Sequence, residues 1–135
     1  MNPNVEVKTE YLKNIKHPSD VKLLSENQLE MLCAEIRRTL IDTVSQTGGH
    51  LASNLGTVEL TVALHKSFNS PDDKIVWDVG HQAYAHKLLT GRYSDFSTLR
   101  TENGISGFVR PDESEHDSFY EGHAGVSISQ AAGIA

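Results

Sequence analysis

The chain has few of the features that mark secreted or membrane proteins. Its 135 residues include a single cysteine, Cys33, so an internal disulfide is impossible. No apolar run reaches the length of a signal peptide, and none approaches the roughly 18 to 20 apolar residues of a membrane span. These absences predict a cytoplasmic protein that does not enter a membrane.

Positive charge is scarce as well. Lysine and arginine together number 12 against 18 aspartates and glutamates, which gives a formal net charge of -6 and an isoelectric point near 5.6. Binding to nucleic acid is driven by clustered lysine and arginine, and the sequence has no such cluster. We therefore expect no nucleic-acid partner, and an anionic ligand would need a local site of its own.

What remains is the composition of a globular protein that forms one domain or part of one. Hydrophobic residues make up 38% of the chain and charged residues 22%, and 135 residues suffice for a hydrophobic core. Residues 1–20 are polar and mixed, and we interpret them as an arm that lies over the molecule and not as a core element. Residues 21–135 are expected to form the domain.

A long amphipathic helix is the clearest predicted element. Ser25 and Gln28 have the spacing of a capping box, and Gly48-Gly49 provides a stop. Between them, apolar residues recur at intervals of three and four, which predicts a helix over residues 26–46. Its apolar face comprises Leu29, Leu32, Cys33, Ile36, Leu40, Ile41 and Val44. In this position Cys33 is a buried packing residue and not a reactive thiol.

A strand, a turn and a helix are predicted next. Residues 58–68 fit both a strand and a helix, and their length favours a helix. Residues 74–79 are mostly β-branched or aromatic and predict a buried parallel strand. Gly80 follows, and residues 82–89 predict another helix. Helices that alternate with a strand-turn-helix unit indicate the α/β class.

The last third of the chain carries a long loop. Residues 92–121 hold one short helical piece, and residues 126–135 begin an apolar helix. We interpret the acidic stretch 111–117 as a solvated face, and His65 and His86 as residues on helix surfaces. The seven histidines and one cysteine lack the spacing of a zinc site, so no metal ligand is assigned.

Two Gly-His pairs stand at predicted starts of helices, where backbone N–H groups favour anions. At Gly80-His81, the glycine allows close approach to a phosphate and the imidazole can donate a hydrogen bond. Gly122-His123-Ala124-Gly125 repeats the pattern before the last helix. From residue types alone, turn glycines beside surface or core histidines are the favoured alternative.

A third histidine follows the predicted long helix. His50 comes directly after Gly48-Gly49, on an irregular segment where a titratable group can face a cleft and relay protons. Ser53 and Asn54 supply neutral hydrogen-bonding groups a few residues later. A helix cap or a turn is an equally open role for these two residues.

Three segments together resemble the 1-deoxy-D-xylulose-5-phosphate synthases. Residues 47–56 read TGGHLASNLG, residues 77–84 read WDVGHQAY, and Gly122-His123 precedes Ser127-Ile128-Ser129. The segments stand in the right order and spacing, and the resemblance runs from about residue 20 to residue 135. Transketolases share the general fold, but these strings look like the synthase.

The resemblance implies a fold and an activity. The fold is part of a thiamine-diphosphate-binding, transketolase-like three-layer domain with a parallel sheet, truncated here, and the intact enzyme is a homodimer of three-domain subunits. It is a transferase that uses thiamine diphosphate and magnesium to condense pyruvate with glyceraldehyde 3-phosphate. Carbon dioxide is released, and the product feeds the synthesis of isoprenoids, thiamine and pyridoxal.

The resemblance also implies roles for individual residues. The positions that match cofactor contacts around the diphosphate are His81, Gly122, His123 and Ala124. His50 matches a residue near the reacting carbon, which implies proton transfer or substrate positioning, and Ser53 and Asn54 are assigned substrate binding or support. Residues 124–126 read Ala-Gly-Val where the family often has Ser-Ser-Thr, so one hydroxyl that could reach the cofactor is missing.

Other parts of the family pattern lie outside this sequence. The magnesium ligands, a Gly-Asp-Gly motif and a later asparagine, are expected beyond residue 135, and the pyrimidine-binding and C-terminal domains are absent. We therefore expect a chain that has no synthase activity by itself. Two alternatives stay open, namely one subunit of a split transketolase-like enzyme and a non-catalytic phosphate-binding module.

Overall fold

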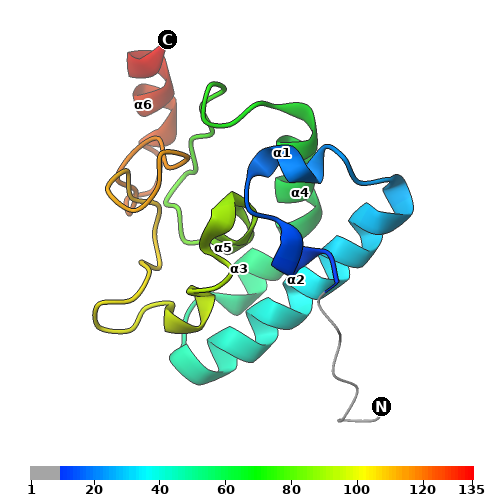
Figure 1. Ribbon diagram of the computed structural model, residues 1–135. Coiled ribbons are helices and arrows are strands. Elements are labelled where there is room, and N and C mark those ends of the chain that lie inside the picture. The colour runs from blue at the N-terminus through cyan, green and yellow to red at the C-terminus, as the bar shows by residue number, and fades with distance from the viewer. Residues whose placement is uncertain (1–9) are drawn as a thin grey trace.

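The structure, a computed structural model, describes residues 10–135, so residues 1–9 of the expected arm lie outside the description. The described chain is a body of packed helices from which the last helix stands apart (Figure 1). In chain order the helices are η1 (Leu12–Asn14), α1 (Pro18–Val21), α2 (Glu26–Thr47), α3 (Leu51–Leu55), α4 (Val58–Ser67), α5 (Tyr84–Lys87), η2 (Leu88–Arg92), η3 (Phe96–Thr98) and α6 (Ser127–Ile134).

Helix α2 confirms the predicted long helix and its ends. The Ser25 backbone N–H donates to Oε1 of Gln28 at 2.8 Å, as the capping box requires. The helix stops at Gly48, whose φ of 76° is the left-handed conformation that glycine adopts without strain. Its buried face includes Leu32, Cys33, Ile36, Leu40 and Val44, so the predicted burial of Cys33 is confirmed.

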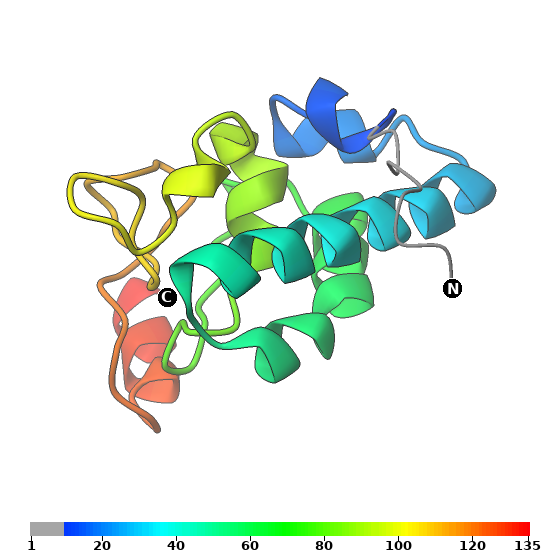
Figure 2. The same ribbon diagram turned by 90° about the horizontal axis from the view of Figure 1, so that it is seen from below.

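Helix α5 lies at the centre of the body, and all four of its residues are buried. It packs against both α2 and α4, and Figure 2 shows α2 running along the length of this body. The helix predicted over residues 82–89 is present as α5 and its irregular continuation η2. The choice of a helix for residues 58–68 is confirmed by α4.

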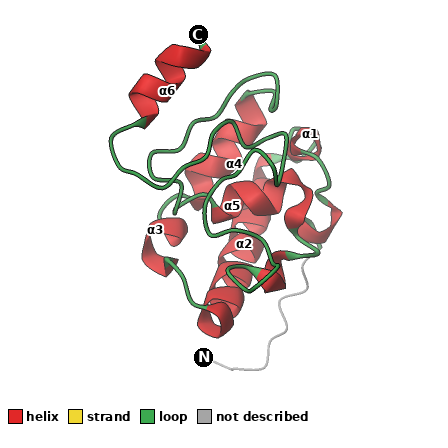
Figure 3. Ribbon diagram, turned by 90° about the vertical axis from the view of Figure 1, so that its left-hand side faces the viewer, coloured by secondary structure: helices red, strands yellow, loops and turns green. Residues whose placement is uncertain are grey.

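The parallel strand predicted over residues 74–79 is wrong. No strand occurs anywhere between residues 10 and 135 (Figure 3). A strand exists only when its N–H and C=O groups pair with a neighbouring strand, and the sequence predicts no second strand to pair with this one. The segment is buried by side-chain packing instead, because Trp77, which is 6% exposed, packs with Ala83 and Val109 in a small second core.

Helix α6 begins where the sequence predicts an apolar helix, but none of its residues is buried. In Figures 1 and 3 it lies away from the other helices. No helix in the described range is long and apolar enough to cross a membrane.

The segment before α1 is anchored to α2 by one buried carboxylate. Glu35 is 3% exposed, and its two oxygens accept hydrogen bonds from the backbone N–H groups of residues 10–12 at 2.8 to 3.2 Å. This anchor brings Leu12 and Ile15 into the main core, at 0% and 3% exposure. The described part of the expected arm is therefore a core element, contrary to the interpretation from sequence.

We expect Glu35→Ala to lower the free energy of unfolding by about 2 to 3 kcal/mol, because it leaves buried backbone N–H groups without acceptors. Urea denaturation of the 135-residue chain measures this change. The control is Glu30→Ala, which removes the same charge from the exposed side of α2 and is expected to change stability by less than about 0.5 kcal/mol. Equal effects of the two substitutions would contradict the anchoring role.

Candidate functional site

Asn54 joins the two segments that carry His50 and His81. Its side chain is fully buried, and its amide nitrogen donates to the backbone oxygens of His50 at 2.6 Å and His81 at 2.8 Å. Its amide oxygen accepts from the N–H of Tyr84 at 2.9 Å. One side chain thus ties α3 to the start of α5, and the sequence-predicted site residues His50, Asn54 and His81 lie together.

The two histidines form a polar site with unused hydrogen-bonding capacity. Their ring centroids are 4.9 Å apart in an edge-to-face arrangement, with His50 exposed and His81 half-buried. Three buried atoms of this site have no hydrogen-bond partner in the described chain, namely Nδ1 of His81 itself, Oγ of Ser53 and Oε1 of Gln82. Buried polar atoms are normally paired, so the three unpaired atoms mark this place as a candidate binding site.

The turn that precedes His81 is strained. Val79 and Gly80 both have positive φ, at 68° and 80°. This conformation is unfavourable for a β-branched residue, and such strain collects at functional sites. A Cβ atom on Gly80 would lie 2.6 Å from Cβ of Glu121, so the glycine is required for close approach. The group that approaches it is Glu121, in the place where the sequence interpretation expected a phosphate.

The second Gly-His segment lies near this turn but does not meet the first histidine pair. Gly122, His123 and Ala124 are exposed, and their backbone N–H groups donate no hydrogen bond within the described residues. The N–H of Gly125 donates to Oδ1 of Asp78 at 2.8 Å. Between residues 10 and 135, no hydrogen bond or ring contact joins His123 to His50 or His81. The link between the two segments is made by Asp78.

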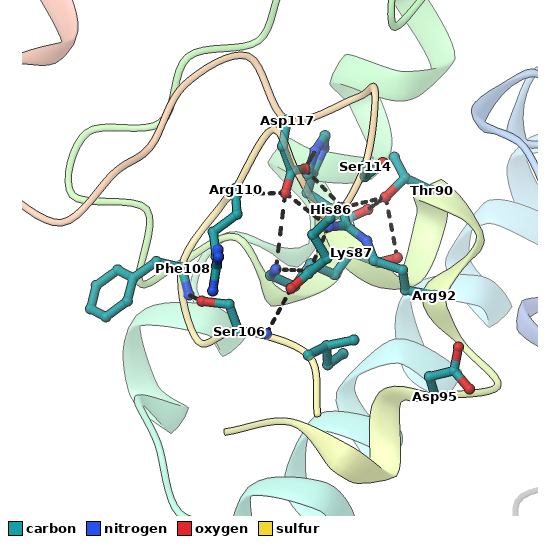
Figure 4. Close-up of polar contacts among 12 residues, drawn as sticks. His86, Lys87, Thr90, Arg92, Asp95, Ser106, Phe108, Arg110, Ser114 and Asp117 are labelled. Atoms are coloured by element: carbon teal, nitrogen blue, oxygen red, sulfur yellow. Dashed lines mark hydrogen bonds and ion pairs between the residues drawn. The ribbon is translucent and has the colours of Figure 1, made fainter. Parts of the chain in front are cut away.

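A buried polar cluster lies where the loop 105–117 packs on α5 and η2 (Figure 4). Its members are His65, His86, Lys87, Arg92, Glu113 and Asp117. Arg92 donates to both oxygens of Asp117 at 2.8 and 2.9 Å and to Oε1 of Glu113 at 2.8 Å. Lys87, fully buried, also forms an ion pair with Glu113. Two cations therefore balance two carboxylates, as buried charges require.

This cluster corrects two interpretations from the sequence. The stretch 111–117 is not simply a solvated face, because Asp117 is 4% exposed and accepts a further hydrogen bond from the N–H of Arg110. His65 and His86 are fully buried and not on helix surfaces. His65 lies three and seven residues after Val62 and Val58, and this helical spacing puts it on their buried face of α4.

The hydrogen bonds determine where each buried imidazole carries its proton. Nε2 of His86 lies 3.1 Å from Oδ1 of Asp117, and a carboxylate can only accept, so this nitrogen is protonated. Nδ1 of a neutral His86 then accepts, and Nε2 of His65 at 2.9 Å donates to it. This series of hydrogen bonds ends at Nδ1 of His65, which has no partner among the described residues.

The pKa values of the cluster follow from burial and pairing. Burial lowers the pKa of His65 to about 3, and burial also lowers the pKa of His86 in spite of its bond to Asp117. Burial alone would raise the pKa of Asp117, but hydrogen bonds from His86 and Arg92 hold that pKa below its usual range. Both histidines are therefore neutral at neutral pH, and Asp117 is ionised.

Sequence interpretation missed Asp78 and Asp117 as organising residues. The available signal for Asp117 was a pair of cations, Lys87 and Arg92, within or beside the apolar run that forms α5, and an acidic stretch later in the chain. Opposite charges of this kind are expected to pair when one set must be buried. No comparable signal exists for Asp78. In the described part of the chain, no three His, Cys, Asp or Glu side chains form a group that could hold a metal ion.

Comparisons with known proteins agree with the sequence resemblance. The chain matches the family model of 1-deoxy-D-xylulose-5-phosphate synthase over residues 12–135. Curated relatives of that name come from Alkaliphilus oremlandii, Syntrophotalea carbinolica and Bacillus licheniformis, which are 61%, 64% and 58% identical to this chain over 125, 124 and 124 residues. These matches cover 93%, 92% and 92% of the chain.

The matched proteins are, by name, enzymes that synthesise a sugar phosphate. The chain belongs to the family of 1-deoxy-D-xylulose-5-phosphate synthase. It spans about a fifth of the length of these relatives, because each match covers 20% of the relative.

We expect the free energy of unfolding to fall as the pH drops from about 6.5 towards 3. An unfolded His65 binds a proton near its ordinary pKa of 6.5, whereas the folded one does so only near 3, so acid favours the unfolded chain. Each such histidine contributes a slope of at most about 1.4 kcal/mol per pH unit. Urea denaturation at a series of pH values measures the slope.

The matched variants for this test are His65→Gln and His123→Gln. Removal of the buried His65 is expected to flatten the profile between pH 6 and pH 4 by roughly one histidine's slope, whatever its effect on stability at neutral pH. Removal of the exposed His123 is expected to leave the slope unchanged. A His65→Gln profile parallel to that of the wild type would show that His65 is not buried and neutral.

Proposed function

We propose that this chain is the N-terminal part of the thiamine-diphosphate-binding domain of a 1-deoxy-D-xylulose-5-phosphate synthase. The intact enzyme is a transketolase-type transferase that condenses pyruvate with glyceraldehyde 3-phosphate and releases carbon dioxide, and it works as a cytoplasmic homodimer. The observation that carries the proposal is the pair His50 and His81, which Asn54 holds together beside buried polar atoms that have no partner.

The residues of this chain suit an anionic cofactor. The backbone N–H groups of the exposed residues 122–124 and Nδ1 of His81 have no hydrogen-bond partner in the described chain, and they would hold the diphosphate. A Cβ atom on Gly122 would meet nothing within 4 Å, so the turn is open to a ligand. When bound, thiamine diphosphate supplies the carbon nucleophile and takes up the electrons released with carbon dioxide.

His50 is suited to proton transfer at the reacting centre. It is exposed, whereas the backbone that carries it is fixed through its carbonyl oxygen by Asn54. A histidine on a rigid segment can exchange a proton with a substrate oxygen without large movement. Ser53 lies on α3, the short helix that begins directly after His50. Its hydroxyl oxygen lacks a partner, and this hydroxyl would orient a substrate group.

Magnesium accompanies the diphosphate in this proposal. No residue of this chain is assigned to it, because the described residues form no group of three metal-binding side chains. Its ligands are expected beyond residue 135 in the intact enzyme, together with the remaining domains.

A chimaeric enzyme tests the proposal. Residues 12–135 replace the matching segment of the Alkaliphilus oremlandii synthase, which is 61% identical to the chain. We expect this chimaera to form 1-deoxy-D-xylulose 5-phosphate from pyruvate and glyceraldehyde 3-phosphate with thiamine diphosphate and magnesium, and the 135-residue chain alone to form none. His50→Gln is expected to lower kcat of the chimaera by at least about 100-fold, as loss of a proton-transfer group does.

The controls separate folding, cofactor binding and chemistry. His50→Gln should leave the affinity for thiamine diphosphate within about threefold, whereas His81→Ala should weaken that affinity by about tenfold, because alanine has no side-chain donor. Product from the 135-residue chain by itself would contradict the need for the other domains. A folded chimaera that binds the cofactor but forms no product would favour a non-catalytic phosphate-binding module.

Ala124 gives a second test, in the same chimaera. Ala124→Ser restores the hydroxyl that the family often has, and we expect it to tighten thiamine diphosphate binding by about fivefold, the effect of one added hydrogen bond. Ala131→Ser, an equal change on the exposed surface of α6, is the control and should leave the affinity unchanged. Equal affinities of the wild-type and Ala124→Ser chimaeras would place residue 124 away from the cofactor. Isothermal titration calorimetry measures all three affinities.

A further inference from the structure

The segment 118–124, which carries Gly122 and His123, is held at both of its ends. At the first end, Asp117 belongs to the buried polar cluster and is bonded to Arg92. At the other end, the Gly125 N–H donates to Oδ1 of Asp78 at 2.8 Å, across 47 positions of sequence. The last three residues of the segment, 122–124, are exposed and make no backbone hydrogen bond within the described chain. The bond from Gly125 to Asp78 is therefore the anchor that directly follows these three residues.

Asp78 is bonded on the other side to the turn that carries His81. Its backbone oxygen accepts from Nε2 of Gln82 at 2.8 Å, so the residue spans the strained turn at Val79 and Gly80. The same residue thus makes hydrogen bonds to both Gly-His segments. Glu121 completes the contact, because its side chain packs on the open side of Gly80 and its N–H donates to the backbone oxygen of Val109 at 3.4 Å.

We propose that Asp78 is a positioning residue of the cofactor site, which sets the distance between His81 and the Gly122-His123 turn through its hydrogen bond to Gly125. This inference rests on the proposed function, since it assigns both segments to one ligand. Asp78 touches neither the substrate nor the reacting atoms. It acts by holding the donors of residues 122–124 at a fixed place relative to His81.

The charge of Asp78 does not explain its place beside an anion site. A second carboxylate, Glu121, is close by, and burial together with Asp78 raises the pKa of Glu121. Two acids beside a diphosphate oppose its binding, so an electrostatic role for Asp78 has the wrong sign. Its hydrogen-bonding oxygen is the useful feature, and asparagine has the same oxygen without the charge. Asp78→Asn and Asp78→Ala therefore separate geometry from charge.

The first measurement is the rate of amide hydrogen exchange at Gly125, which NMR monitors in the cofactor-free 135-residue chain. Asp78→Ala is expected to speed exchange of this amide by about tenfold, whereas Asp78→Asn should keep it within about threefold of the wild type. Asp72→Ala, which removes a charge from an exposed turn, is the control and should leave it unchanged. Because Asp78 is exposed, these variants should fold, and the remaining amides check this. Unchanged exchange in Asp78→Ala overturns the link.

The second measurement is the affinity of the chimaera for thiamine diphosphate. Asp78→Ala should weaken it by about tenfold with kcat at saturating cofactor within about threefold, and Asp78→Asn should restore an affinity equal to or tighter than that of the wild type. Equal losses in both variants would mean that the charge matters, and this overturns the proposal. If Asp78→Ala leaves the affinity for thiamine diphosphate unchanged, the positioning role of Asp78 is overturned and the proposed function is not. A wild-type chimaera that binds no thiamine diphosphate overturns the proposed function, and this inference with it.

Discussion

The arrangement of the site depends on the hydrogen bonds of one buried amide, that of Asn54. It satisfies two carbonyl oxygens and one N–H from segments that are far apart in the chain. Each bond contributes about 1 kcal/mol net, but an unsatisfied buried backbone group costs about 1 to 3 kcal/mol. Leaving these groups unpaired therefore costs more than their hydrogen bonds gain. For that reason His50 and His81 lie together even though α3 and α5 are short.

The buried polar cluster performs the same task for the loop 105–117. An irregular loop has few backbone partners of its own, and here Glu113 and Asp117 accept from the N–H groups of Ser106 and Arg110 at 2.8 Å. Lys87 and Arg92 compensate the buried carboxylates. A network in which each buried charge has an opposite partner favours a single position for the loop, because moving the loop away leaves a charge unpaired in the interior. The loop then delivers the segment with Gly122 and His123 to the edge of the site.

The helices were predictable because their signals are local. The capping box at Ser25, the apolar spacing of α2 and the glycine at position 48 all lie within the element that they define. The state of residues 74–79 was not predictable in this way, since β-branched residues indicate burial as well as strand pairing. The structure retains the burial of Trp77 without any pairing. His65 was misjudged although its spacing from Val58 and Val62 indicates the buried face of α4.

The sequence by itself determined the helices α2 and α4, the burial of Cys33, and the family, through the strings at residues 47–56 and 77–84. Only the tertiary structure decided which polar groups meet. The bonds from Asn54 to His81 and from Gly125 to Asp78 span 27 and 47 positions. Local propensity is set by neighbours within a few residues, whereas these bonds form only after the packing of the chain has brought distant segments together.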